Sequence, residues 1–147
     1  GIEAALSCSR LGIKTLLVTT NTDRIGYMSC NPAIGGLAKG HMVREMDALG
    51  GEMAKATDAT CIQYKRLNAK KGPAVRGSRA QCDKDLYVQY MSGAVRSQNN
   101  LSIEQAEVKS LVLDGSICRG VVLDDGSKVE AQKVIITTGT FMNAVMH

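Results

Sequence analysis

The sequence predicts an α/β fold, because a short helical segment leads through one glycine into a buried strand and short alternating strands follow in the second half of the chain. Its 147 residues are enough for one ordinary domain. A hydrophobic content of 44% with 22% charged residues is typical of a globular chain and excludes a disordered tail.

The first half is predicted to open with a helix and a strand in immediate succession. Residues 1–12 read as a helix of small residues that stops at Gly12, and residues 14–19 as a short apolar strand of the buried parallel kind. Together they are half of a βαβ unit. A glycine-punctuated loop is expected over residues 20–40, and a helix over 41–49.

The middle of the chain is expected to return to helix. A short strand is predicted around residues 61–64, followed by a basic loop that ends in Gly72-Pro73. Ser78 is a residue type that caps helices, so we expect it to begin a long helix that runs to about Ser97.

After Asn99-Asn100 the apolar period changes from that of a helix to that of a strand. Asp114-Gly115 and Asp125-Gly126 are strong hairpin-turn dipeptides. The predicted strands are residues 101–104, 108–113, 118–123 and 128–130, followed by a second buried strand over 133–138 that ends at Gly139. This order predicts a Rossmann-like FAD-binding domain of the glutathione-reductase type, with an antiparallel β-meander over its sheet.

Such a domain needs a first strand and a Gly-x-Gly-x-x-Gly turn before its first helix. The helix here opens at Gly1, which we expect to be the last glycine of that fingerprint. Residues 1–147 are therefore expected to be a partial domain, cut at both ends. The acid that binds the ribose in most such domains is also missing, because the second strand ends in Thr19-Thr20-Asn21.

The spacing of the cysteines, the apolar runs and the distribution of charge limit the class of protein further. The five cysteines are at least 21 residues apart, which favours free thiols in a reducing cytoplasm and offers no zinc-knuckle spacing, so no metal site is expected. The sequence contains no signal peptide and no apolar run near the roughly 20 residues that span a bilayer, so we expect no membrane association. The net charge is +4, yet six basic and no acidic residues occupy positions 65–79. This patch is either a solvated face with a site for a cofactor's phosphates or a contact surface for an RNA backbone.

Several motifs carry a resemblance that reaches over the whole chain. The longest is the loop Ile25–His41, with Met-Ser-Cys-Asn-Pro-Ala-Ile-Gly-Gly at 28–36, and the others are Asp47–Gly51, Leu67–Ala69, Lys71–Arg76, Arg79–Gln81 and Thr138–Phe141. These blocks resemble the GidA/MnmG family of tRNA uridine-modifying enzymes. In that family the second strand also ends in polar, uncharged residues, as Thr20-Asn21 does here.

The resemblance implies an activity and its partners. Family members are FAD enzymes that add an aminomethyl or carboxymethylaminomethyl group to C5 of the wobble uridine of tRNA. Methylenetetrahydrofolate supplies the one-carbon unit, NADH serves as reductant, and an MnmE-type GTPase is the partner. They are homodimers with an inserted domain and a helical C-terminal domain, neither of which is expected within these residues.

Cys30 is the predicted catalytic residue. It lies in a Gly/Pro-rich loop, where nearby Lys39 and His41 favour the thiolate. The resemblance implies that it is one of two catalytic cysteines, with either attack on C6 of uridine or proton transfer as its role. The predicted FAD-binding residues are Gly1, Gly35, Gly36, Gly40, Gly139 and, through the resemblance, Val108. The residues predicted to contact RNA or phosphate are Lys71, Arg76 and Arg79.

Two other interpretations stay open. A different FAD oxidoreductase of the same superfamily, acting on a small molecule, would lack the Ser-Cys-Asn-Pro loop and usually carry an acid after the second strand. The closer folate-dependent tRNA-methylating flavoenzymes carry that acid too. Alternatively, the chain as it stands is an inactive structural fragment that binds FAD poorly or not at all.

Overall fold

The computed structural model describes residues 1–28 and 30–139. Four α-helices, eight strands and two short 3-10 turns are found among them. In chain order they are α1 (Ile2–Arg10), β1 (Thr15–Thr19), η1 (Thr22–Arg24), β2 (Ala33–Gly35), α2 (Lys39–Ala48), α3 (Met53–Thr60), β3 (Cys61–Leu67), η2 (Pro73–Val75), β4 (Gly77–Cys82), α4 (Lys84–Arg96), β5 (Leu101–Gln105), β6 (Val108–Asp114), β7 (Ile117–Leu123) and β8 (Lys128–Glu130).

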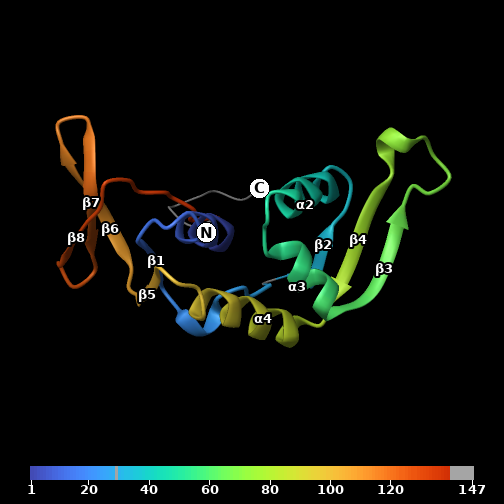
Figure 1. The fold of residues 1–147 in the computed structure, drawn as a ribbon, viewed down its shortest axis with the longest axis horizontal. Helices are drawn as coiled ribbons and strands as arrows, with labels where there is room; N and C mark the ends of the chain where they lie inside the picture. Colours follow the sequence, from blue (N-terminus) through green and yellow to red (C-terminus); the bar gives the residue numbers. More distant parts are fainter. Residues whose placement is uncertain (29, 140–147) are drawn as a thin grey trace.

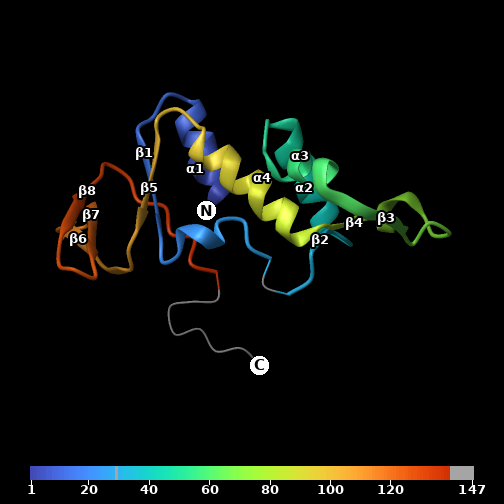
Figure 2. The same cartoon turned by 90° about the horizontal axis from the view of Figure 1, so that it is seen from below.

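The strands form three small sheets along an elongated molecule (Figures 1 and 2). The meander β6–β7–β8 lies at one end and the β3–β4 hairpin projects at the other, with the four helices between them. Strands β1 and β5 pair in parallel next to α1 and α4, whereas β2, β4 and β3 pair antiparallel next to α2 and α3. The predicted α/β class is confirmed.

The parallel pair is covered by helices that meet in one apolar cluster. Leu6 of α1, Val95 of α4 and Ile25 of the loop after η1 are buried together, and Leu17 and Ile103 of the two strands pack against them. Helix α1 ends where the sequence predicts, since Gly12 has a φ of +82°, which a glycine adopts without strain.

A second cluster holds the antiparallel sheet. Ala56 of α3, Cys82 of β4, and Tyr87 and Met91 of α4 are buried together, with Ile34 of β2 packed against them. These side chains come from α3, α4, β2 and β4. The cluster therefore fixes the two strands relative to the two helices.

The antiparallel meander is confirmed, with turns at both predicted dipeptides. Gly115 and Gly126 have φ values of +58° and +84°, as tight hairpin turns require. The first of the four predicted short strands, β5, does not join the meander. It pairs in parallel with β1 instead, from Thr15 opposite Leu101 to Thr19 opposite Gln105.

The predicted helix start at Ser78 is wrong. Residues 77–82 are strand β4, and α4 begins at Lys84 with Asp83 as its cap, whose Oδ1 accepts from the N–H groups of Asp85 and Leu86. The reason is tertiary: β4 is the central strand between β2 and β3, and pairing with both strands satisfies its backbone groups on both sides.

The predicted buried strand over residues 133–138 is also wrong. The segment runs without strand pairing, and Ile135 and Ile136 are 62% and 55% exposed. Its apolar pattern suits a strand, but β1 and β5 pair only with each other among the described residues, and the segment passes the start of α1 instead. An apolar run needs a partner strand as well as a pattern.

None of the helices that the structure describes is long and apolar enough to cross a bilayer.

Candidate functional site

The first part of the candidate site is the N-terminus of α1. Gly1 is the N-cap and makes no side-chain capping hydrogen bond, so the first-turn N–H groups carry no cap from it. A Cβ on Gly1 would lie 3.0 Å from Thr137 Oγ1, so the two segments pass close to each other at this glycine. A helix start with a glycine at its tip fits a pyrophosphate group.

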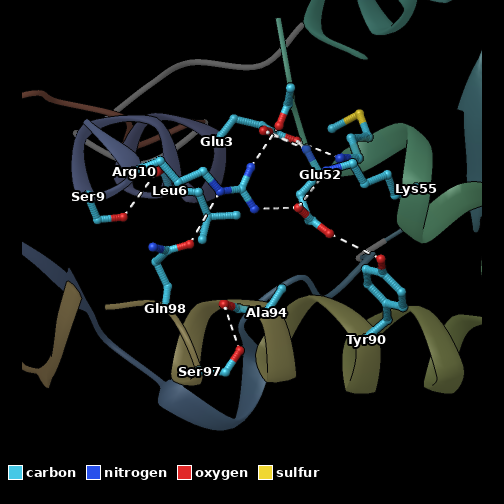
Figure 3. A network of polar contacts seen from close by, with 12 residues as sticks. Glu3, Leu6, Ser9, Arg10, Glu52, Lys55, Tyr90, Ala94, Ser97 and Gln98 are labelled. Atoms are coloured by element: carbon cyan, nitrogen blue, oxygen red, sulfur yellow. Dashed lines mark hydrogen bonds and ion pairs between the residues drawn. The ribbon is translucent and has the colours of Figure 1, made fainter. Parts of the chain in front are cut away.

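One acidic residue, Glu3, lies in the first turn of α1 and would repel a phosphate. Its carboxylate is directed elsewhere: it accepts from the backbone N–H groups of Glu52 and Met53, the latter at 2.6 Å, and so caps α3 from another helix (Figure 3). The start of α3 neutralises this charge in part, because the dipole of a helix is positive at its N-terminus.

Glu52 is the centre of the same network (Figure 3). It is only 6% exposed, pairs with Arg10 and accepts a hydrogen bond from Tyr90 Oη at 3.1 Å. Arg10 also donates to Gly50 O at 2.7 Å. The network therefore ties α1 to α3 and α4 and sets the position of the α1 N-terminus. Burial by itself raises the pKa of the Glu52 carboxyl, but hydrogen bonds from Arg10 and Tyr90, with Lys55 nearby, lower it overall.

Replacing Glu52 by glutamine is expected to destabilise the protein by about 2 kcal/mol at neutral pH, because Arg10 and Tyr90 lose a charged partner. Since the folded-state pKa is depressed, the stabilisation is present above the unfolded value of about 4.3 and is lost as the pH falls through the folded value. The difference in unfolding free energy between wild type and Glu52→Gln should therefore shrink as the pH is lowered below about 4.3. Denaturant unfolding of both proteins between pH 7 and pH 3 measures it.

The matched control is Glu107→Gln, which removes an exposed ion pair with Lys109. Such pairs contribute little, so this variant should change stability by less than about 0.5 kcal/mol at any pH. A constant difference between wild type and Glu52→Gln across the whole pH range would contradict the assignment.

The second part of the site is the loop that carries Cys30. On one side Ile25 is buried in the core, and a Cβ on Gly26 would approach Met91 of α4 to 2.7 Å. On the other side Pro32 O accepts from Cys82 N at 2.7 Å. Cys30 itself is exposed. The loop is thus fixed at both sides and presents the Cys30 thiol to solvent, as a reactive cysteine requires.

The other cysteines differ from Cys30 in their surroundings. Cys82 is buried, and burial raises the pKa of its thiol, so it is an unreactive core residue. Cys8 and Cys118 are half-buried, whereas Cys61 is exposed on β3 opposite Cys82. Lys39 and His41 are exposed at the start of α2, and within the described residues neither makes a hydrogen bond with Cys30.

Tyr27, three residues before Cys30, is an exposed aromatic residue that the sequence analysis did not single out. Lys84 Nζ lies 4.4 Å from its ring centroid, and the Arg24 guanidinium 5.3 Å. The Lys84 contact holds this side of the loop against the start of α4, whereas the Arg24 contact is local. Lys84 is 57 positions away in sequence, so no local signal predicts the contact.

The predicted flavin glycines at the end of the loop are brought together against Ser78 of β4. The N–H of Gly36 donates to Ser78 O at 2.7 Å, and the N–H of Gly40 donates to Gly36 O at 3.0 Å. A Cβ on Gly35 would lie only 2.3 Å from Ser78 O. These glycines allow β2 to approach β4, and two of the N–H groups assigned to the cofactor are used inside the protein. Their contact with FAD stays a prediction.

The predicted phosphate contacts lie on the β3–β4 hairpin. Arg76 Nε donates to Lys71 O at 2.8 Å, so this side chain partly serves to shape the turn at the tip. Lys71 is exposed. Arg79 lies lower on β4, directly opposite Lys65 of β3. Together with Gln63, Leu67 and Gln81 these two cations line a hollow of about 230 Å³.

Of the remaining predicted residues, Val108 lies near the carboxyl end of β1. The N–H of Ala106 donates to Thr19 O at 3.0 Å, and Val108 follows two residues later as the first residue of β6. Asn21, where an acid is usual, caps η1 through a bond from Asp23 N at 2.8 Å. Gly139 has a φ of +63°. The predicted motif at 138–141 extends beyond Gly139 into residues that the structure does not describe.

Three lining residues of the hollow on the β3–β4 hairpin were not predicted from the sequence as site residues: Lys65, Gln63 and Gln81. Side chains two residues apart on a strand point to the same face, so residues 63, 65 and 67 share one face of their strand, and residues 79 and 81 share one face of theirs. Only the register, however, places the two sets opposite each other.

The comparisons with known proteins agree over the full chain. The tRNA uridine 5-carboxymethylaminomethyl modification enzymes MnmG of Bdellovibrio bacteriovorus and Geobacter sulfurreducens are 67% and 56% identical over all 147 residues. The chain spans 23% of the length of each of these relatives.

Solved structures match as well. GidA of Aquifex aeolicus matches with a TM-score of 0.92 at 52% identity, over 96% of this chain and 23% of that one. The GidA-related protein of Thermus thermophilus matches at 17% identity with a TM-score of 0.61, over 96% of this chain and 49% of that one, and this shows the fold alone. The Rossmann-like fold class is therefore confirmed. Since the model of the glucose inhibited division protein A family matches residues 1–147, the chain belongs to this family.

Proposed function

We propose that the protein carrying this chain is a flavin- and folate-dependent enzyme that modifies C5 of the wobble uridine of tRNA in the cytoplasm. The exposed Cys30, held in a loop fixed to α4 and β4, is the single observation that carries the proposal. Identities of 67% and 56% to two MnmG enzymes support the substrate. The group added to C5 is aminomethyl or carboxymethylaminomethyl.

In this proposal Cys30 is the nucleophile. Its thiolate adds to C6 of the uridine, an S–C6 bond forms, and the electron pair moves through C5 towards O4, which makes C5 nucleophilic. After C5 has taken up the one-carbon unit, its proton leaves and the S–C6 bond breaks. A thiolate suits the first step because it is a far better nucleophile at neutral pH than a hydroxyl group.

The FAD pyrophosphate is assigned to the N-terminus of α1 at Gly1, with the adenosine side towards Val108 and the carboxyl end of β1. FAD would supply the redox chemistry, with NADH as reductant and methylenetetrahydrofolate as one-carbon donor. Gly139 and the Gly35–Gly40 turn are assigned to the flavin's surroundings. A homodimer and an MnmE-type GTPase complete the proposed assembly.

The test is reconstitution with the intact protein. The purified protein is incubated with its GTPase partner, methylenetetrahydrofolate, NADH, GTP, an ammonium or glycine source and unmodified tRNA, and the nucleosides are analysed by mass spectrometry. Bound FAD and the appearance of a 5-substituted wobble uridine are expected. A flavin-loaded protein that oxidises NADH but leaves tRNA unchanged would overturn the proposal in favour of small-molecule oxidoreduction.

A further inference from the structure

Two cations face each other on one side of the β3–β4 hairpin. The register pairs Lys65 directly with Arg79, so their Cβ atoms are about 5 Å apart on the same face. Like charges in this position repel each other and destabilise a sheet. An anion between them would convert the repulsion into attraction.

The charge of the hairpin is not balanced locally. No acidic residue occurs between Asp58 and Asp83, whereas six basic residues do: Lys65, Arg66, Lys70, Lys71, Arg76 and Arg79. None of the ion pairs found among the described residues involves any of the six. The hairpin also projects from the helical part of these residues (Figures 1 and 2).

The face with the two cations is hollowed and polar. It carries the hollow of about 230 Å³, where Gln63 and Gln81 form the next cross-strand pair. Since side chains alternate along a strand, this face is opposite to the one on which Ala80 and Cys82 are buried. Arginine and lysine bind phosphate oxygens, and the glutamine amides add donors and acceptors for a ribose.

We propose that this face of the hairpin, with Lys65 and Arg79 sharing one phosphate, binds the sugar-phosphate backbone of the RNA substrate. The inference rests on the proposed function for the identity of the RNA and adds the surface that holds it. The Arg79 guanidinium donates two hydrogen bonds to the phosphate, and the Lys65 ammonium adds a positive charge from the opposite strand. Arg66 projects from the other face of β3 and takes no part.

The hollow leads towards the Cys30 loop. Gln81 is paired with Gln63 on one side and with Ala33 of β2 on the other. Cys30 is three residues before Ala33, so their Cα atoms are within about 11 Å of each other, at no more than ~3.6 Å per residue. A strand of RNA whose phosphate is held at Lys65 and Arg79 therefore has its neighbouring nucleotides within reach of the thiol.

The dinucleotides FAD and NADH also carry phosphates. The start of α1 offers a separate site of the type that binds a dinucleotide, and α2 and α3 lie between it and the hairpin (Figure 1). A face whose lining is two cations, two glutamines and Leu67, without an aromatic residue, suits a charged backbone better than an adenine ring.

The test is binding of a fluorescent RNA anticodon stem-loop with a wobble uridine to the intact, flavin-loaded protein, measured by anisotropy over a range of salt concentrations. Lys65→Gln and Arg79→Gln should each weaken binding about tenfold. Because both side chains hold one phosphate, the double variant should lower the slope of log K against log salt by about one, not two. Its loss of affinity should also be smaller than the product of the two single losses.

Two matched variants test whether the position of the charge matters, because each removes one positive charge outside the proposed face. Arg66→Gln removes a cation next to Lys65 in sequence but on the other face, and Lys128→Gln removes an exposed cation from β8 at the far end of the molecule. Both should bind RNA within about twofold of wild type. Flavin content reports folding for every variant.

The outcomes separate the two proposals. Wild-type RNA binding that Lys65→Gln and Arg79→Gln leave intact would overturn the inference and spare the proposed function. Absence of RNA binding by wild type would overturn the proposed function itself. Competition by NADH for this site, or a changed sedimentation coefficient of the double variant without loss of RNA affinity, would assign the face to a dinucleotide or to a protein contact and overturn the inference.

Discussion

Replacing Cys30 by serine is expected to lower tRNA modification by the intact protein at least about 10³-fold while FAD stays bound. The change replaces one sulfur atom by oxygen at an exposed position, so neither the core nor the α1 N-terminus is disturbed. The hydroxyl of serine is not ionised at neutral pH and cannot replace a thiolate. Nucleoside mass spectrometry measures the modification, and the flavin absorbance of the purified variant measures the cofactor.

Cys61→Ser is the matched control, because Cys61 is also an exposed thiol and lies on β3 in the same sheet as β2. It should modify tRNA at the rate of wild type. A denaturing gel adds a second readout: a covalent RNA–protein adduct, trapped during turnover, should form with Cys61→Ser and be absent with Cys30→Ser. Modification that survives in Cys30→Ser would remove this thiol from the chemistry.

Local sequence signals predicted the elements that are determined locally. Helix α1, its glycine stop and the following strand were placed within two residues of their observed bounds, and β8 was placed at its observed residues 128–130. The meander was predictable because Asp-Gly dipeptides fix the turns, and the turns fix which strands pair. No distant partner is needed for any of these decisions.

The failures concern segments whose state depends on pairing with other segments. Strand β4 was taken for the start of a helix because nothing in residues 77–82 reveals that β2 and β3 pair with both of its edges. Residues 133–138 have the composition of a buried strand. A strand forms only where it pairs with another strand, and this segment has no partner in the part of the chain that is described. In both cases local propensity was overridden by tertiary context.

The same distinction applies to the candidate site. The motif at 28–36 located Cys30 correctly in a loop, and the composition of residues 65–79 located the basic surface. The facing of Lys65 and Arg79, and the use of the Gly36 and Gly40 N–H groups within the protein, follow from the register of β3 and β2 on β4. A register is a relation between segments, and a single sequence does not specify it before the fold is known.

Gly35→Ala is expected to destabilise the protein by about 3 kcal/mol or more, the largest stability effect expected of a single methyl group in this loop. Its Cβ would lie 2.3 Å from Ser78 O, an oxygen that cannot retreat without breaking the hydrogen bond from Gly36 N. The φ of +92° adds backbone strain. Because β2 would be pushed away from β4, the loop that presents Cys30 should shift as well, and tRNA modification should fall with stability.

Gly36→Ala separates the contact from the backbone strain. Its φ is +115°, also unfavourable for alanine, but nothing lies within 4 Å of the added Cβ. Strain alone should cost about 1–2 kcal/mol. The difference between the two variants in urea unfolding free energy, at least about 1 kcal/mol, therefore measures the approach of β2 to β4. Equal destabilisation by the two substitutions would contradict this explanation. Both glycines would then be needed for their backbone angles only, and the contact of Gly35 with Ser78 O would add nothing to stability.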